Sequence, residues 1–354
     1  MKKVLLVVPS LEQGGAQKFV MDLANELDKT KYEVRVLSYY KKTNSVFDEF
    51  AEKNGIHVIY LDKTLGFHLS FIKKVRNVVR QYKPDVIHTN IDSILYMLPS
   101  YKRKQIKLHT VHSIAEKESS GKKRKIRSIA YKLFGVVPVA ISDTVAESIS
   151  RVHNMKQEKI PIVYNGVDCK RYDIPKISSN KIRFVTVGTI YSVKNFPFLV
   201  DSFAELCKEF DNLDLTIVGD GVDRENLQIQ IDSLGLSDKI HITGCVYDVE
   251  NYLAKADVYV ACSLFEGLPI SMLEAMSAGL PVVSTDVGGV KDIIKDGVNG
   301  ILVESGNKEK YVQALKELIL NESIREIYSA KAKEISKNYD IRLMVEGYER
   351  IYQK

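Results

Sequence analysis

The chain has 354 residues, which at about 150 residues per domain predicts two domains rather than one. Hydrophobic residues make up 45% of it and charged residues 27%, with 20 Gly and 9 Pro, and this globular composition excludes a disordered or fibrous protein. Its cysteines, Cys169, Cys207, Cys245 and Cys262, form no C-x-x-C pair, so neither a zinc site nor a disulfide framework is indicated. A reduced, cytoplasmic chain is the simplest interpretation.

Charge is distributed unevenly along the chain. Residues 1–170 hold 30 Lys and Arg against 17 Asp and Glu, whereas residues 171–354 hold 21 against 28. Most of the basic excess falls in residues 71–134, with 16 basic and 4 acidic side chains, so we expect one strongly cationic surface. No segment reaches 18 uninterrupted apolar residues, and we expect a protein that does not cross a membrane, although it can lie on one.

Short β-branched runs alternate with helical segments along both halves of the chain, a pattern typical of parallel α/β units. In the first half the expected strands are 4–8, 33–38, 57–61, 85–89, 107–111, 137–142 and 161–164. In the second half, after a polar linker within 170–181, they are 183–187, 213–218, 239–243, 258–262, 281–285 and 300–303. The pattern predicts two doubly wound domains, at 1–170 and 171–340, with a helix at 341–354 packing back on the first.

In open parallel sheets a ligand lies beyond the carboxyl ends of the strands, so the loops there are the places to search. The first such loop reads PSLEQGGAQKFV, in which Gly14 and Gly15 precede a helix. Two glycines allow backbone N–H groups to approach a phosphate, although a tight turn without a ligand explains them as well. In the second half Gly219 and Gly221 follow a strand, but Arg224 stands where a dinucleotide fingerprint has its third glycine, which disfavours hydride transfer.

The segment SLFEGLPISMLEAMSAGLPVVST, residues 263–285, combines a loop with a helix over 270–278 that ends at Gly279. Glu266 lies on the loop and Glu274 on the helix, at most about 12 Å apart at 1.5 Å per residue, close to the length of a nucleoside diphosphate sugar. The helix N-terminus between them suits a diphosphate. Taken alone, such glutamates are most often solvent-facing charges.

Together with further motifs, this segment resembles the retaining glycosyltransferases of family 4, including those that build bacterial polysaccharides and lipid-linked glycans. The resemblance implies an α/β protein with the GT-B fold, in which two Rossmann-like doubly wound domains face each other across a cleft. The motifs, in chain order, are GGAQ at 14–17, LHTVHS at 108–113, VYNGVDCKRY at 163–172, VGTIYSVKN at 187–195, IVGDGVDRENL at 217–227 and ITGCVYDVENYLAKADVYV at 242–260.

The resemblance implies three catalytic residues, Glu266, His112 and Lys194. Glu266 would hold a hydroxyl of the transferred sugar, His112 would lie beside that sugar, and Lys194 would neutralise the departing diphosphate. Glu274 would accept hydrogen bonds from the ribose hydroxyls. The other donor-binding residues that it implies are Gly14, Gly15, Gly188, Thr189, Gly219, Cys245, Val246, Gly267, Leu268, Pro269 and Ile270, with the base held by the backbone around Cys245 and Val246.

One position departs from the family pattern, because Thr189 follows Gly188 where the family commonly has Arg. A hydroxyl donates a hydrogen bond but supplies no charge, so stabilisation of the leaving group is expected to fall on Lys194 and the helix N-terminus. For His88 and His112 a purely structural role is the alternative, in which each lies in a loop and donates a hydrogen bond to backbone carbonyls. The sequence contains no Asp-x-Asp, which favours transfer without a metal or other cofactor.

The basic stretch KKRKIRSIAYKLF, at 122–134, places Ile126, Ile129, Ala130 and Leu133 at helical spacing beside five cations. HLSFIKKVRNVVRQY at 68–82 has a similar pattern. Such a stripe can lie in lipid headgroups or pack on the sheet of its own domain. No nucleic-acid module is recognisable, so we expect no nucleic acid, and an anionic membrane with a polyprenyl-diphosphate-linked acceptor fits the charge.

These observations predict retaining transfer of a hexose from a nucleotide-sugar, UDP-linked rather than GDP-linked, to a glycan or lipid-linked saccharide in cell-surface polysaccharide synthesis. The expected location is cytoplasmic, peripheral on the inner face of the membrane if the cationic stripe binds lipid. A nucleotide-sugar 2-epimerase of the same architecture and a catalytically silent sugar-nucleotide binding protein are the alternatives.

Overall fold

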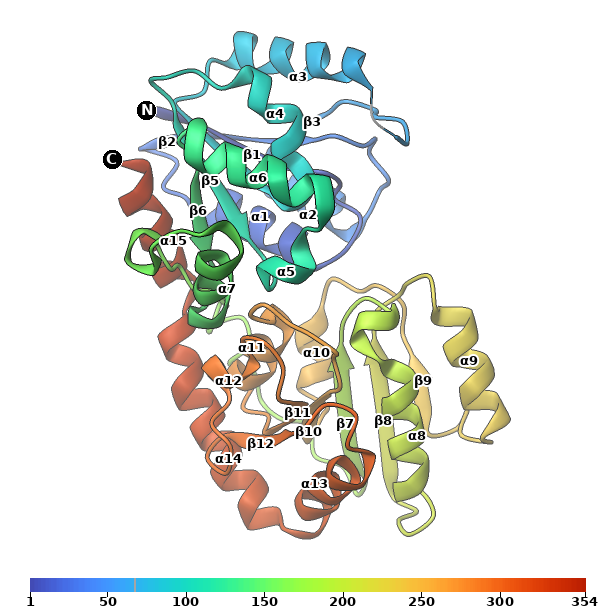
Figure 1. Ribbon diagram of the computed structural model, residues 1–354. Coiled ribbons are helices and arrows are strands. Elements are labelled where there is room, and N and C mark those ends of the chain that lie inside the picture. Colours follow the sequence, from blue (N-terminus) through green and yellow to red (C-terminus); the bar gives the residue numbers. More distant parts are fainter. Residues whose placement is uncertain (67) are drawn as a thin grey trace. The chain divides into compact units, whose positions relative to one another are not determined.

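The computed structural model describes residues 1–66 and 68–354, and the chain divides into two compact units (Figure 1). The first unit comprises Met1–Asn165 together with Ile341–Lys354, and the second comprises Gly166–Asp340. Each unit contains one six-stranded sheet in which all paired strands are parallel. The chain therefore leaves the first unit, builds the second, and returns with its C-terminal helix.

The first unit has the strand order β3-β2-β1-β4-β5-β6. Its strands are β1 (Lys2–Val8), β2 (Tyr32–Ser38), β3 (His57–Tyr60), β4 (Val86–Asn90), β5 (Ile106–Val111) and β6 (Val137–Ala140). Its helices are α1 (Gly15–Glu26), α2 (Val46–Lys53), α3 (Leu69–Tyr82), α4 (Ile94–Met97), α5 (Ala115–Glu118), α6 (Gly121–Leu133), α7 (Asp143–His153) and α15 (Ile341–Tyr352).

The second unit repeats this order as β9-β8-β7-β10-β11-β12. Its strands are β7 (Ile182–Val187), β8 (Leu213–Val218), β9 (Ile240–Ile242), β10 (Val258–Ala261), β11 (Val282–Thr285) and β12 (Gly300–Val303). Its helices are α8 (Phe196–Leu206), α9 (Arg224–Ser233), α10 (Val249–Leu253), α11 (Ile270–Ser277), α12 (Val290–Ile293), α13 (Lys308–Leu320) and α14 (Glu322–Ser336).

Both units thus have the 3-2-1-4-5-6 order of the Rossmann fold, which confirms the predicted class of two doubly wound α/β domains. The order reverses between β1 and β4 in the first unit and between β7 and β10 in the second. Crevices for ligands form at such switch points, beyond the carboxyl ends of the strands. The loops after β1, β4, β7 and β10 are therefore the parts of the fold that position a site.

One expected strand is absent from the described residues, because the segment 161–164 forms only an isolated bridge between Ile162 and Ala140. The backbone N–H of Ala140 donates to the carbonyl of Pro161, and Val163 N–H donates to Ala140. Pro161 has no N–H to donate, so the pairing does not extend into a ladder. The prediction of a strand at 161–164 was wrong for this reason.

Helix α15 completes the core of the first unit. It packs against α1, and its Tyr348 and Tyr352 are fully buried beside Phe19 and His88. Gly347 allows α15 to approach Val163 closely, since a Cβ there would lie 2.8 Å from a methyl of Val163. Across residues 1–66 and 68–354, none of the helices combines the length and hydropathy needed to span a membrane.

Candidate functional site

The loop after β7 places a cation at the switch point of the second unit. Gly188 follows the strand, a single 3-10 turn spans Ser192–Lys194, and Asn195 adopts a left-handed conformation (φ 54°) before α8 begins. The side chain of Lys194 folds back over Gly188, so closely that a Cβ added at Gly188 would lie 3.3 Å from Cε of Lys194. The sequence of this loop therefore directs the ammonium group toward the neighbouring loop after β10.

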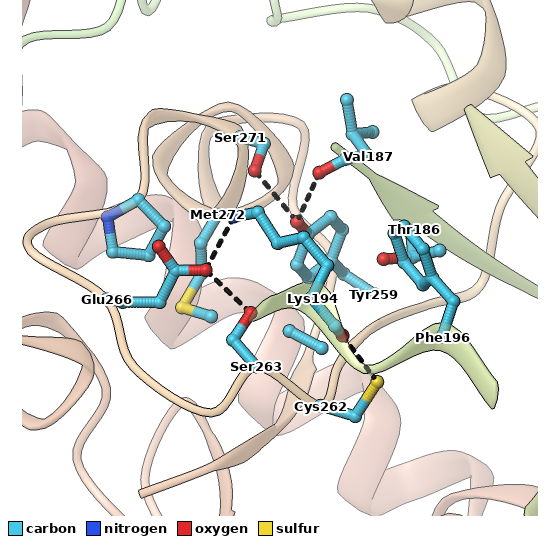
Figure 2. A pocket seen from close by; sticks show the side chains of 12 residues that line it. Thr186, Val187, Lys194, Phe196, Tyr259, Cys262, Ser263, Glu266, Ser271 and Met272 are labelled. Carbon is cyan, nitrogen blue, oxygen red and sulfur yellow. Dashed lines mark hydrogen bonds and ion pairs between the residues drawn. The ribbon is translucent and has the colours of Figure 1, made fainter. Parts of the chain in front are cut away.

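Figure 2 shows the cation meeting Glu266 from that neighbouring loop. Nζ of Lys194 donates to Oε1 of Glu266 at 2.5 Å, and the hydroxyl of Ser263 donates to the same oxygen at 2.6 Å. Ser263 is held in turn, since the Thr285 hydroxyl donates to its carbonyl at 2.7 Å. The loops after β7 and β10, together with the end of β11, thus fix the carboxylate of Glu266 within a small pocket, which Tyr259, Ser271 and Met272 also line.

The ion pair keeps Lys194 charged although the site is partly shielded from water. The exposed fraction of the side chain is 19% for Lys194 and 15% for Glu266. Burial by itself would lower the pKa of Lys194, but the negative charge of Glu266 and the hydrogen bond to it raise that pKa above its ordinary value. At neutral pH Lys194 therefore carries its positive charge, which the carboxylate of Glu266 balances within the pair.

Gly219 brings the loop after β8 against the loop after β7. Its φ is +155°, and a Cβ at this position would lie only 2.0 Å from the carbonyl oxygen of Gly188. Gly219 also forms a bridge with Gly244, so the loop carrying Cys245 and Val246 starts beside the same switch point. Only glycine permits this close contact of backbones, and no other residue type could replace it without moving the loop.

Glu274 lies on α11, the helix that follows the Glu266 loop, and is 2% exposed. Its Oε1 accepts a hydrogen bond from the hydroxyl of Tyr172 at 2.7 Å. Tyr172 is itself 2% exposed and comes from the segment that opens the second unit. A buried carboxylate held by a hydroxyl donor is a suitable acceptor for further hydroxyl groups.

Sequence reasoning missed both Tyr172 and Ser263 as site residues. Tyr172 is the last residue of the quoted VYNGVDCKRY motif, and Ser263 opens the segment that contains both glutamates, so position within the motifs was the available signal. Their hydroxyls contact Glu274 and Glu266, respectively. Ser263 is 3 positions from Glu266 in the chain, whereas Tyr172 is 102 positions from Glu274. The contact between Tyr172 and Glu274 could therefore not be deduced from sequence spacing.

The turn between Glu266 and α11 presents backbone rather than side chains. Gly267, Leu268, Pro269 and Ile270 are all buried, with Leu268 3% and Ile270 5% exposed. Because the first N–H groups of a helix have no intrahelical partner, α11 directs its positive end toward this turn. Thr189, half-buried in the loop after β7, contributes a hydroxyl rather than a charge.

The base-binding segment expected around Cys245 and Val246 lies in the loop after β9. Cys245 is exposed and Val246 is half-buried, so both can be reached from solvent. Partial burial raises the pKa of the Cys245 thiol, with Asp220 adding to the effect, which keeps the thiol protonated at neutral pH.

The remaining predicted residues lie in the first unit. Gly14 precedes α1 with φ of +132°, and Gly15 is the first residue of that helix, where a Cβ would meet no heavy atom within 4 Å. His112 follows β5, with Nε2 2.9 Å from Oδ1 of Asn90 and its ring against the edge of Phe19. Burial lowers the pKa of His112 to about 4, so the imidazole is neutral at pH 7.

His88 has a structural role. It is fully buried, Nδ1 lies 2.7 Å from the hydroxyl of Tyr352, and Nε2 lies 2.6 Å from the hydroxyl of Thr110. Burial is the main cause that holds the pKa of His88 well below its ordinary value, and the nearby His112 and His109 lower it further. Both ring nitrogens are occupied, so His88 fixes α15 to the sheet.

Helix α6 divides its predicted apolar stripe between core and solvent. Ala130 is fully buried, whereas Ile129 is 45% and Leu133 is 77% exposed, and Phe134 beyond the helix is 40% exposed. The stripe therefore lies at the boundary between core and solvent, and on the buried side of the helix Arg127 pairs with Glu118 at 2.8 Å. The exposed side combines these apolar residues with three exposed lysines, Lys122, Lys125 and Lys132.

The described part of the chain holds no group of three His, Cys, Asp or Glu side chains arranged to bind a metal ion.

Two family comparisons match complementary parts of the chain. The family described as "Glycosyl transferases group 1" matches residues 172–335, and the family described as "Glycosyltransferase Family 4" matches residues 13–171. Together the two matches cover every strand except β1 (Lys2–Val8) and every site residue named above.

Individual relatives agree with these matches. An uncharacterized glycosyltransferase of Haemophilus influenzae is 26% identical over 99% of this chain and 100% of its own. The N-acetylgalactosamine-N,N'-diacetylbacillosaminyl-diphospho-undecaprenol 4-alpha-N-acetylgalactosaminyltransferase of Campylobacter jejuni is 27% identical over 55% of this chain and 53% of its own. The crystal structure of HepE from Anabaena in complex with UDP-glucose superposes with a TM-score of 0.87 over 100% of both chains at 20% identity, a likeness of fold.

Proposed function

This chain belongs to glycosyltransferase family 4 and has the GT-B fold, and on that premise we propose that it transfers a hexose from a UDP-sugar to a lipid-linked saccharide with retention of configuration. The observation that carries the proposal is the contact between Lys194 and Glu266 at the switch point of the second unit. The product would enter cell-surface polysaccharide synthesis on the cytoplasmic side of the membrane.

The chemistry of this contact suits a nucleotide-sugar. The ammonium of Lys194 and the N-terminus of α11 offer positive charge to a diphosphate, which bears its negative charge as the sugar departs. Glu266 and Glu274 provide carboxylates that accept hydrogen bonds from sugar and ribose hydroxyls. UDP is preferred over GDP because the HepE structures, which share this fold, contain UDP, UDP-glucose, or UDP and glucose.

Retention is supported by the absence of a strong base among the proposed catalytic residues. Inversion requires a base that takes the proton of the attacking hydroxyl on the face opposite the leaving group. Oε1 of Glu266 already accepts hydrogen bonds from Lys194 and Ser263, and the lowered pKa of His112, about 4, makes that imidazole a weak base at neutral pH. We therefore assign neither residue to proton removal.

A lipid-linked acceptor and an anionic membrane are proposed for the first unit. The Campylobacter relative is named for a diphospho-undecaprenol acceptor. The exposed side of α6 presents Lys122, Lys125 and Lys132 beside Ile129 and Leu133, a combination that suits lipid headgroups and their acyl boundary.

A thermal-shift and product experiment tests the proposed function. The purified chain is heated with each of a panel of UDP- and GDP-sugars. A donor present at a concentration of about 100 times its Kd should stabilise the folded chain by about 2.7 kcal/mol. The stabilising donor is then incubated with and without polyprenyl-diphosphate saccharides, and the anomeric configuration of the product is determined by NMR. A product formed without any acceptor indicates an epimerase instead, and binding without turnover with every acceptor indicates a silent binding protein.

A further inference from the structure

The side-chain amide of Asn90, at the end of β4, has only one orientation that satisfies its neighbours. Asn90 is fully buried, and its Nδ2 donates to the carbonyl of Val7 at 3.2 Å and to that of His88 at 3.4 Å. A flipped amide would point an oxygen at two carbonyl oxygens and lose both hydrogen bonds. Oδ1 of Asn90 is therefore the atom that faces His112.

This orientation decides which ring nitrogen of His112 carries the proton. Oδ1 can only accept, so Nε2 of His112, 2.9 Å away, must be the protonated nitrogen of the neutral ring. The other nitrogen, Nδ1, then has a lone pair and can only accept a hydrogen bond. Such an atom recognises a hydroxyl group and repels a phosphate oxygen.

The turn after Asn90 is strained, which is unusual for the residue type that it contains. Ile91 has φ of +53°, a left-handed conformation that a β-branched residue rarely adopts. The buried guanidinium of Arg127 holds this turn, donating to the carbonyl of Ile91 at 3.0 Å and to Asp92 at 3.2 Å. Strain of this kind persists where the surrounding contacts impose it, and it concentrates at functional sites.

We propose that Asn90 is a positioning residue for sugar transfer, which holds the ring of His112 with its proton on Nε2 so that Nδ1 accepts a hydrogen bond from a hydroxyl of the transferred sugar. This inference rests on the proposed function. It assigns His112 the recognition of a hydroxyl. The strained turn at Ile91, which Arg127 holds, keeps the side-chain amide of Asn90 within hydrogen-bonding distance of the His112 ring.

The charges around His112 are compatible with a ring that stays neutral. Burial is the main cause of its low pKa, His109 and Arg127 lower that pKa further, and Glu118 opposes them. His88 is also close enough to interact, and its own pKa lies well below the ordinary value. Replacing the neutral acceptor Asn90 by a carboxylate would add an opposite charge beside Nε2–H and favour the imidazolium form.

The first test measures the ring itself and does not depend on activity. The full chain is labelled with ¹⁵N-histidine, and the two ring nitrogens of His112 are titrated by NMR. In the wild type we expect a neutral ring with Nε2–H at pH 7. In Asn90→Asp the pKa of His112 should rise by about 1 to 3 units. A protonated Nδ1 in the wild type, or an unchanged pKa in a folded Asn90→Asp variant, would overturn the proposal.

The second test separates positioning from stability through kinetics. Asn90→Ala should lower turnover at least about 10-fold while UDP affinity stays at the wild-type value, since a displaced ring loses its alignment with the sugar. The double variant with His112→Ala should lose no more than His112→Ala alone, because both changes remove one interaction. Asn299→Ala, equally buried but in the second unit, is the matched control for loss of a buried amide. Additive losses in the double variant would show a general structural role for Asn90 and contradict the proposal.

These readouts distinguish failure of this inference from failure of the proposed function. If no nucleotide-sugar binds and no acceptor is glycosylated, the proposed function fails, and the NMR titration still reports whether Asn90 fixes the ring. If transfer is observed but the titration of His112 is insensitive to Asn90→Asp, the proposed function stands and the positioning role is rejected.

Discussion

Lys194 and Glu266 form an ion pair of 2.5 Å between the loops after β7 and β10, and Ser263 shares the acceptor oxygen. The pair occupies the switch point, where a doubly wound sheet places its ligands. On the proposed function, a diphosphate would meet a cation already held in position by Glu266, so binding would require little further ordering of the Lys194 side chain.

The two glutamates should separate into turnover and binding. Glu274→Ala removes a buried acceptor on α11 and should weaken binding of the UDP-sugar by about 1.5 to 3 kcal/mol. This loss of binding free energy corresponds to a Kd raised roughly 10- to 150-fold. Glu266→Ala should mainly lower kcat, because Glu266 is one partner of the ion pair proposed to act as the sugar leaves. Steady-state kinetics with calorimetric UDP binding measures both, and wild-type constants in either variant remove that glutamate from the site.

Gly15→Ala tests whether the backbone at the start of α1 contacts the donor. The added methyl group meets no heavy atom within 4 Å, and alanine favours the start of a helix, so the melting temperature should not fall. We expect kcat/KM to fall about 10-fold or more if the backbone of Gly15 contacts the diphosphate. Gly55→Ala, in the same unit, is the control: at φ of +65° it should cost about 1 kcal/mol of stability without affecting transfer. Unchanged kinetics in Gly15→Ala exclude this contact.

Transfer should continue in excess EDTA, because Lys194 and the N-terminus of α11 supply the positive charge that a divalent ion would otherwise supply. Initial rates are measured before and after chelation, with the donor saturating. Complete loss of activity, restored by Mg²⁺ or Mn²⁺, would show that a metal takes part.

The free energy of unfolding should fall as the pH drops from about 6.5 to 4. Burial lowers the pKa of His153, like that of His112, to about 4, whereas an unfolded histidine titrates near 6.5. The unfolded chain therefore binds protons first, and this stability is fully present above pH 6.5 and lost toward pH 4 at up to about 1.4 kcal/mol per unit for each histidine. The pKa values of the buried His88 and His109 are lowered as well, so His153→Gln, which removes one of four such histidines, should reduce the slope of stability against pH in urea denaturation by about a quarter. Identical slopes in the variant and the wild type would contradict this expectation.

The exposed side of α6 should bind anionic vesicles. Three substitutions, Lys122→Gln, Lys125→Gln and Lys132→Gln, should weaken co-sedimentation about 100-fold, at about 1 kcal/mol per charge near the surface. Lys123 and Arg124 are less suitable, because Lys123 pairs with Asp92 and Arg124 donates to backbone carbonyls.

The matched control for vesicle binding replaces three other exposed lysines of the first unit, Lys29, Lys41 and Lys53, by glutamine. It makes the same change in net charge and should retain binding. Equal loss in both triple variants would indicate a response to net charge alone, and a wild type that never binds vesicles would direct the search to soluble acceptors.

The sequence was sufficient to predict two doubly wound α/β domains and the positions of most strands, because buried parallel strands are continuous apolar runs. It failed at 161–164, where the apolar run was right but Pro161 limits pairing to one bridge. For α6 it left two packings of the apolar stripe open, because helical spacing cannot show which side of a helix faces the core: Ala130 faces the core while Leu133 faces solvent.

The candidate site was only partly predictable for a related reason. Residues just after strands, such as Lys194 and Glu266, are found by their position in the α/β repeat. Their mutual contact, and the hydroxyl of Tyr172 on Glu274, depend on loop conformations such as that at Asn195 and on the close backbone approach at Gly219. The link from Arg127 through the strained Ile91 to Asn90 has no sequence signature at all.

The return of the chain in α15 has a consequence for biosynthesis. Tyr348 and Tyr352 fill the interior beside His88, and Lys2 at the start of β1 donates to the carbonyl of Tyr352. During translation α15 is made after every element of the second unit, residues 166–340, so the first unit lacks one wall of its core until α15 has been made. The half of the protein that is synthesised first therefore cannot complete its core until the second half has been made, and its unfinished apolar interior is the surface that a chaperone would meet on the nascent chain.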